Sequence, residues 1–362
     1  MEPNSRRSLS LQAGFTLVEI MVGLAIGMLA TVVIMQVFSV FEAQKRTTTG
    51  TADAQTNAGI ALYNIGRELQ MAGYPLMPAV DSALECTALT VNGVADATVP
   101  NRLSPVVIVN GVAAAGVNAS DTFTLRYGNS LGGGIPSPIT AMAGADATVS
   151  SNLGCRAGDI TLITNAAATC AMSSAGTVPG NTTVTLADTT GAVAGANLAC
   201  LGVWNEITYA VNNGNLQRSG VDSVAGIVNI QAQYGVSAVA NSNQVTRWVN
   251  AKNLAEWVVA VDGASTGVDW GNNITVANRN RIKAVRIAVV ARNAKMEPGN
   301  VTTACSSLTA AAPTGLCAWA GSVASPAPTL DLSADPNWRR YRYRVFETII
   351  PLRNMIWAKD TL

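Results

Sequence analysis

Apolar residues form one long unbroken run near the start of the chain. Residues 20–41 carry no charge, and as a helix they would span roughly 33 Å, enough to cross a hydrocarbon core of about 30 Å. Arg6 and Arg7 precede the run, as in a secretory signal peptide. However, such signals have an apolar region of only about 7–15 residues and a small-x-small cleavage site after it. The run is longer and lacks that site, so it predicts a transmembrane helix that stays in the mature protein.

A carboxylate, Glu19, stands at the beginning of this apolar segment. A charged side chain inside a membrane span costs about 2.5 kcal/mol or more unless it has a partner. The sequence shows no basic partner for Glu19 within the same helix, so we expect the partner to lie elsewhere.

The helical pattern continues beyond the apolar run. A stripe of apolar residues recurs at helical spacing, and it consists of Ala54, Ala58, Ala61, Leu62, Ile65, Leu69 and Ala72. Gly73-Tyr74-Pro75 follows, which is a typical helix stop. We therefore expect one helix over residues 15–73, with its first half in a membrane and its second half packed on a globular domain.

From Leu76 onward the pattern changes to short β runs between clusters of turn residues. The expected strands are 106–109, 122–127, 159–164, 182–187, 206–211, 227–236, 284–291 and 341–350, with a hairpin turn at 212–215. Residues 110–121, 128–158 and 165–181 are rich in small and polar residues, and they indicate either long surface loops or an inserted β subdomain.

These elements predict an α+β fold in which a long N-terminal helix packs against a large, antiparallel, β-rich globular domain. The expected organisation is a leader (1–14), a membrane helix (15–41), its continuation (42–74), a loop-rich β subdomain (75–205) and a C-terminal β-sheet region (206–362).

Composition argues against catalysis. Only 12% of the 362 residues are charged, the net charge is +1, and the chain contains no histidine. Ser-His-Asp and Cys-His catalysis and all histidine-containing metal sites are therefore excluded. Gly132-Gly133-Gly134 lacks the Lys-Ser/Thr of a phosphate-binding loop, and no paired-carboxylate motif stands out. We predict neither an enzyme nor a bound metal or cofactor.

The six cysteines, Cys86, Cys155, Cys170, Cys200, Cys305 and Cys317, all follow the membrane run, and none has C-x2-C spacing. Disulfides of an oxidising compartment fit this pattern better than a metal site. Fifteen connectivities are open. Loop closure favours sequence neighbours, which predicts the pairs Cys305–Cys317, Cys170–Cys200 and Cys86–Cys155.

Twelve of the 23 basic residues lie in two short stretches, 279–295 and 339–359. In the second stretch the alternation of a strand places Arg342 and Arg344 on one face and Tyr341 and Tyr343 on the other. The arginines could form a solvated face, bind an acidic neighbouring subunit, or bind DNA. A subunit is favoured over DNA, because the tyrosines on the opposite face cannot stack on bases between the arginines.

The run Gly14-Phe15-Thr16-Leu17-Val18-Glu19 resembles the class III signal of type IV pilins and type II secretion pseudopilins. The resemblance implies that a prepilin peptidase cleaves between Gly14 and Phe15 and methylates the new N-terminus at Phe15. It also implies that Glu19 faces an N-terminal ammonium group, of its own or a neighbouring subunit, in the filament. Many major pilins have a disulfide loop at the C-terminus itself. Here the last cysteine is 45 residues from the end, which argues against a major subunit.

Three further segments, 234–236, 283–292 and 342–354, resemble minor pilins of the PilW family. That resemblance implies a minor pilin that primes type IV pilus assembly with other minor pilins, the major pilin and a tip adhesin. Such pili serve adhesion and twitching motility. We expect the chain in the bacterial inner membrane, with its C-terminal domain in the periplasm, and then at the pilus tip. The alternatives are a J-like type II secretion pseudopilin and a tip pilin that binds DNA or a surface; a membrane-anchored enzyme is the weakest.

Overall fold

The computed structural model describes residues 14–76, 86–98, 102–112, 119–165, 169–239, 242–251, 270 and 276–356. Most of the expected leader and Lys359 of the second basic stretch lie outside these residues. Contacts within the chain divide it into two compact units, one ending at Gly50 and the other running from Thr51 to Leu362. Each unit is described by itself.

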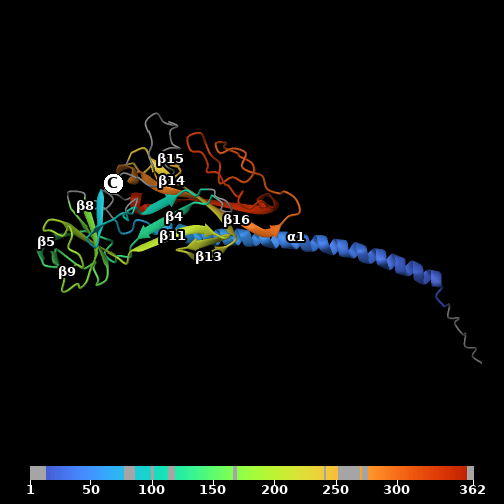
Figure 1. Ribbon diagram of the computed structural model, residues 1–362, viewed down its shortest axis with the longest axis horizontal. Coiled ribbons are helices and arrows are strands. Elements are labelled where there is room, and N and C mark those ends of the chain that lie inside the picture. Colours follow the sequence, from blue (N-terminus) through green and yellow to red (C-terminus); the bar gives the residue numbers. More distant parts are fainter. Residues whose placement is uncertain are drawn as a thin grey trace, which may run out of the picture. The chain divides into compact units, whose positions relative to one another are not determined.

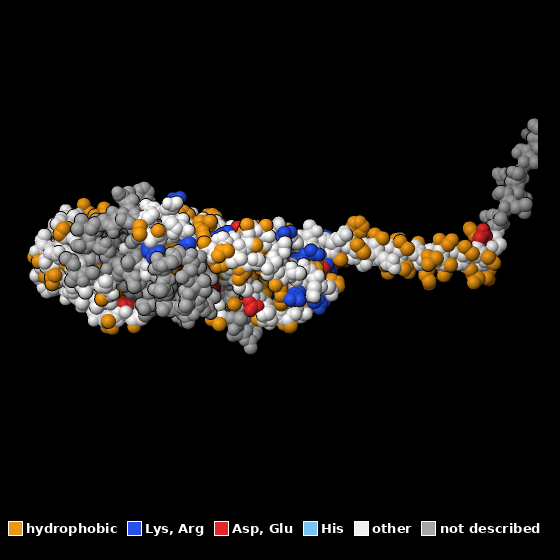
Figure 2. Space-filling model, turned by 90° about the horizontal axis from the view of Figure 1, so that it is seen from above, with side chains coloured by type: hydrophobic (Ala, Val, Ile, Leu, Met, Phe, Trp, Pro, Cys, Tyr) orange, Lys and Arg blue, Asp and Glu red, His pale blue; other side chains and the backbone are white. Residues whose placement is uncertain are grey.

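The first unit is helical. Helix α1 runs from Leu17 to Met71, close to the expected 15–73, and its part up to Gly50 belongs to this unit. The apolar side chains between Phe15 and Phe41 are exposed, as Figure 2 shows along the helix. The most apolar 18-residue window has a mean hydropathy of 2.5 and no buried residue. Length and composition therefore suit this segment to a membrane.

In the second unit, the rest of α1 packs on the sheets. The buried positions include Ala54, Ala58, Ala61, Ile65 and Leu69, which are members of the predicted stripe. They join one core with residues from two sheets. The helix ends at Met71, and Gly73 follows it with a φ of +80° that suits glycine. A Cβ there would also approach the Pro105 ring to 3.1 Å.

Two antiparallel sheets form that core with α1 (Figure 1). One has the order β15-β14-β16-β17, with β14 at Ile227–Ser237, β15 at Val245–Val249, β16 at Ile282–Met296 and β17 at Tyr341–Pro351. The other has the order β13-β12-β11-β4-β3, with β3 at Val106–Val109, β4 at Thr122–Tyr127, β11 at Asn205–Asn212, β12 at Asn215–Arg218 and β13 at Val221–Ala225. The predicted hairpin turn joins β11 to β12, and both Asn213 and Gly214 have positive φ.

A third sheet of eight strands has its own core clusters. Its order is β2-β1-β8-β7-β10-β5-β6-β9. In that same order the strands span Val94–Ala95, Ala88–Val91, Thr169–Ser174, Ile160–Thr164, Asn197–Gly202, Ser137–Ala143, Asp146–Val149 and Thr183–Thr185. The loop-rich segments thus contain strands of an inserted β subdomain. All pairs are antiparallel except β1 with β8.

The predicted fold class is confirmed, but the sheets do not divide the chain at residue 205. Strands β3 and β4 come from the segment 75–205 and yet pair with β11 or with each other. The third sheet is therefore inserted around them rather than forming one continuous stretch.

The disulfides are Cys86–Cys170, Cys155–Cys200 and Cys305–Cys317. The third was predicted from the sequence, whereas the predicted Cys170–Cys200 and Cys86–Cys155 pairs are wrong. Sheet order explains the error, because β1 pairs in register with β8 and brings Cys86 beside Cys170. Loop-closure entropy grows only slowly with loop length, so it does not override such a topology.

Between β16 and β17 the chain forms an irregular segment that carries the Cys305–Cys317 loop. It covers one face of the sheet, where Trp319 packs on Ala288 and Leu316 packs near Val290. The described residues also include three short helices: α2 at Val276–Arg279, the 3-10 helix η3 at Trp338–Arg340, and α3 at Arg353–Ile356.

Candidate functional sites

The expected processing site lies at the start of α1. Gly14 and Phe15 precede the helix, and the Phe15 side chain is 84% exposed. The Thr16 backbone N–H donates to Glu19 Oε2, and the Glu19 N–H donates to Thr16 Oγ1, each at 3.3 Å. This reciprocal arrangement is a capping box, so Glu19 does have a partner in its own helix. The Thr-x-x-Glu signature of this motif is present in the sequence at Thr16 and Glu19.

Glu68 is a buried carboxylate on the sheet-facing side of α1, and sequence reasoning missed it. It is 5% exposed. The Tyr209 hydroxyl donates to its Oε2 at 2.8 Å, and Arg218 donates to its Oε1 from Nε at 2.9 Å and Nη2 at 2.7 Å. Burial and this hydrogen bond raise the pKa of Tyr209 well above its ordinary value. The cluster therefore ties α1 to the β11–β12 hairpin.

Most residues of the first basic stretch bind within the domain. Arg279 is buried, donates to the Cys86 carbonyl at 3.1 Å, and has its pKa lowered to about 10 by burial. Arg286 pairs with Glu347 at 2.8 Å and stacks on the Trp319 ring, while Lys283 is only 1% exposed. These side chains stabilise the fold and are not a free basic surface.

Some residues of the second basic stretch also make contacts within the domain. Arg340 donates to the Glu297 carbonyl, and Arg339 lies over the Trp338 ring. Arg342 Nε donates to Glu297 Oε1 at 3.0 Å, although the arginine remains 51% exposed. Arg344 is exposed and makes no ion pair or side-chain hydrogen bond with any residue that the structure describes. The basic residues that cluster in the sequence therefore do not form one continuous basic patch on the surface.

Arg342 and Arg344 line a small cavity of about 170 Å³ together with Thr51, Ala54, Asn293 and Thr302. Both arginines lie on one face of β17, whereas Tyr343 faces the other way, where its hydroxyl donates to the Trp338 carbonyl. The predicted alternation of the strand is thus present. This alternation places the guanidinium groups of Arg342 and Arg344 at the same cavity.

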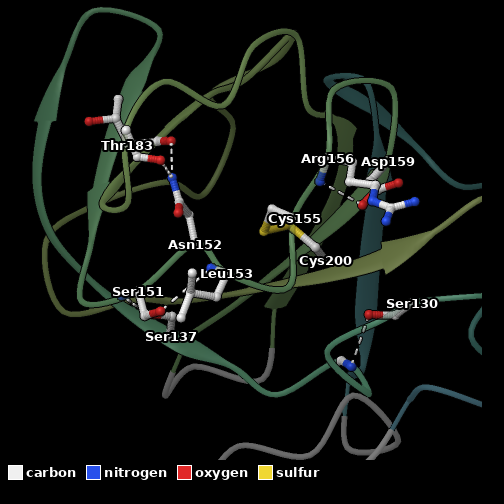
Figure 3. Close-up of a disulfide and its surroundings, with 12 residues drawn as sticks. Ser130, Ser137, Ser151, Asn152, Leu153, Cys155, Arg156, Asp159, Thr183 and Cys200 are labelled. Atoms are coloured by element: carbon white, nitrogen blue, oxygen red, sulfur yellow. Dashed lines mark hydrogen bonds between the residues drawn. A yellow bond between two sulfur atoms is a disulfide. The ribbon is translucent and has the colours of Figure 1, made fainter.

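A larger cavity of about 410 Å³ lies in the inserted subdomain beside Cys155–Cys200 (Figure 3). Its serines accept backbone hydrogen bonds: Ser130 Oγ from Gly134, Ser137 Oγ from Ser151, and Ser151 Oγ from Leu153. None of the residues lining it has an ionisable side chain. The cavity therefore offers no base for a serine nucleophile. Among the described residues, no group of three His, Cys, Asp or Glu side chains could hold a metal.

Comparisons with known proteins match both ends of the chain. Residues 205–354 match the family model of type IV pilus-assembly protein W, PilW, and residues 9–35 match the prokaryotic N-terminal methylation motif. No curated protein matches the chain. The solved type IV-like pilin TTHA1219 from Thermus thermophilus is similar at 10% identity and a TM-score of 0.34, over 84% of this chain and 97% of that one. A TM-score and an identity this low do not support any conclusion about the fold or function of this chain.

A methylation motif on an apolar helix, whose continuation packs on a β-rich domain, defines a type IV pilin-like protein. The PilW match runs from β11 into α3 and includes some of the strands that share a core with α1. Residues 205–354 of the chain thus form a PilW-type domain. The pilin family and fold are structural rather than catalytic, and the motif implies processing by a prepilin peptidase.

Proposed function

We propose that this chain is a minor pilin that primes assembly of a type IV pilus, at the pilus tip, together with other minor pilins, the major pilin and a tip adhesin. One observation carries the proposal: a prepilin motif at the start of an apolar helix and a PilW-type domain occur in the same chain. In this role the chain is not an enzyme and needs no cofactor.

In the proposed maturation, the peptidase cleaves between Gly14 and Phe15 and methylates Phe15. Before assembly the apolar part of α1 anchors the chain in the inner membrane, with the domain in the periplasm. Three disulfides support an oxidising compartment for that domain.

Deleting the gene in its own organism tests the proposal. We expect far fewer surface pili and normal type II secretion, both restored by the wild-type gene. If secretion fails while piliation stays normal, the chain is a pseudopilin of the secretion system instead. DNA binding is not favoured, since most of the clustered basic residues bind within the domain.

Glu19→Ala should give a stable, processed chain that does not support piliation. In the filament the Glu19 carboxylate would pair with an N-terminal ammonium group, which compensates for its desolvation. Its loss removes that pairing, while the domain does not contain Glu19 and should fold normally.

Pilus counts and immunoblots of the mature chain measure this effect. Glu42→Ala is the matched control, because Glu42 is an exposed acid of α1 paired only with Arg46 at i+4. Normal pilus numbers in the Glu19→Ala strain would disprove the role assigned to Glu19.

A further inference from the structure

We propose that the cavity between Arg342 and Arg344 binds one carboxylate side chain of a neighbouring pilin subunit. This inference rests on the proposed function, since it requires a neighbouring subunit, and it identifies the chemical group that the subunit presents.

The position of β17 relative to α1 places both arginines at the end of the core. Phe346 and Ile350 pack in the core that α1 shares with the sheets. Side chains two positions apart lie on the same face of a strand, so Arg344 and Arg342 continue this face. There they meet Thr51 and Ala54. These short side chains leave space above the arginines that larger residues would fill.

The walls of this cavity are held by hydrogen bonds that do not use Arg344. Asn293 is 2% exposed, and its Nδ2 donates to Thr51 Oγ1 at 3.4 Å. Asn293 Oδ1 accepts from the Lys295 N–H at 2.9 Å. Thr302 Oγ1 donates to the Tyr341 carbonyl at 2.6 Å. These hydrogen bonds fix the side chains that line the cavity, so the cavity is a defined part of the folded domain.

The charge balance of the cavity is positive. Its lining contains two guanidinium groups and no carboxylate. Glu297, which lies beside it, accepts a hydrogen bond from Arg342 Nε. A guanidinium group presents a planar fork of donors that matches a carboxylate. One further carboxylate would thus complete the pairing.

The size and surroundings favour a side-chain carboxylate over a nucleic acid. A cavity of about 170 Å³ holds an acidic side chain. Tyr343 also lines it, but its hydroxyl is turned to the Trp338 carbonyl, so its ring is not presented as a platform for a base. The ring of Tyr341 instead lies under Arg292. Phosphate shares the same anionic chemistry, so the experiment must separate the two.

The binding test uses the full chain in neutral detergent and follows the Nε–Hε resonances of arginine by NMR. The probes are blocked glutamate, its neutral isostere blocked glutamine, and inorganic phosphate. We expect a saturable shift of the Arg344 resonance with blocked glutamate, none with blocked glutamine, and loss of saturation in Arg344→Gln. Arg353→Gln is the control, because Arg353 is exposed on α3. No saturation, or tighter binding of phosphate than of glutamate, would overturn the proposal.

The cellular test compares Arg344→Glu with Arg353→Glu. We expect Arg344→Glu to reduce pilus numbers although the chain is processed and stable, Arg344→Lys to retain part of them, and Arg353→Glu to be normal. Normal piliation with Arg344→Glu, alongside failure of Glu19→Ala, would reject this inference and leave the proposed function standing. If gene deletion leaves piliation intact, the proposed function fails, and the NMR titration still decides whether the cavity binds carboxylate.

Discussion

Replacing Gly14 with aspartate is expected to leave the chain as an unprocessed precursor in the membrane. Cleavage is proposed directly after Gly14, where the smallest residue precedes the scissile bond. An aspartate side chain would add both bulk and a negative charge next to that bond. Because the anchoring helix follows the cleavage site, the precursor should still insert but should not enter pili.

Immunoblots of membrane and sheared-pilus fractions measure this outcome, since loss of residues 1–14 changes the mobility of the chain. Gly59→Ala is the control, because Gly59 also belongs to the N-terminal helix and a Cβ there meets no atom within 4 Å. This variant should be processed and assembled normally. A Gly14→Asp chain of mature length would show that the cleavage site lies elsewhere.

Arg218→Met should lower the free energy of unfolding of the domain by about 3 kcal/mol. The substitution leaves the Glu68 carboxylate buried, and among the described residues only the Tyr209 hydroxyl would still donate a hydrogen bond to it. Methionine keeps an unbranched apolar side chain, so the loss of the ion pair dominates. The effect lies at the lower end of the range for buried pairs, because the Arg218 side chain is 44% exposed and water reaches it.

Urea unfolding of the full chain in detergent, followed by tryptophan fluorescence, measures this loss. Arg46→Met breaks the exposed Arg46–Glu42 pair of the same helix and should change the unfolding free energy by no more than about 0.5 kcal/mol. Equal unfolding midpoints for Arg218→Met and the wild type would mean that the Glu68 cluster does not hold α1 to the hairpin.

Local patterns in the sequence predicted the elements well. The alanine-rich stripe and Gly73 gave the helix and its end, since helical spacing and a glycine stop act through nearby residues. The predicted strands 106–109 and 122–127 coincide with β3 and β4. The hairpin turn was predictable because Asn213 and Gly214 tolerate positive φ.

Long-range pairing could not be predicted in the same way. The order of strands in the inserted sheet decides which cysteines meet, and no local pattern encodes that order. Similarly, Arg286 and Arg342 find acidic partners 61 and 45 residues away in the chain. A cluster of charge in a sequence therefore says little about the charge of a surface when strands bring distant acids beside it.

The capping box at Thr16 and Glu19 is a different case, because its signal was local and present in the sequence. It gives the Glu19 carboxylate a hydrogen-bond partner in the isolated chain. We propose that assembly replaces or supplements this partner with an ammonium group created by cleavage before Phe15, one residue from Thr16.

The N-terminal peptide of the chain in sheared pili tests the central claim most directly. Trypsin should release residues 15–45, since no lysine or arginine lies between Phe15 and Lys45. Mass spectrometry should find this peptide beginning at Phe15 and heavier by one methyl group on its N-terminal residue. Peptides from residues 1–14 in the assembled pili, or an N-terminus beyond Phe41, would contradict the account.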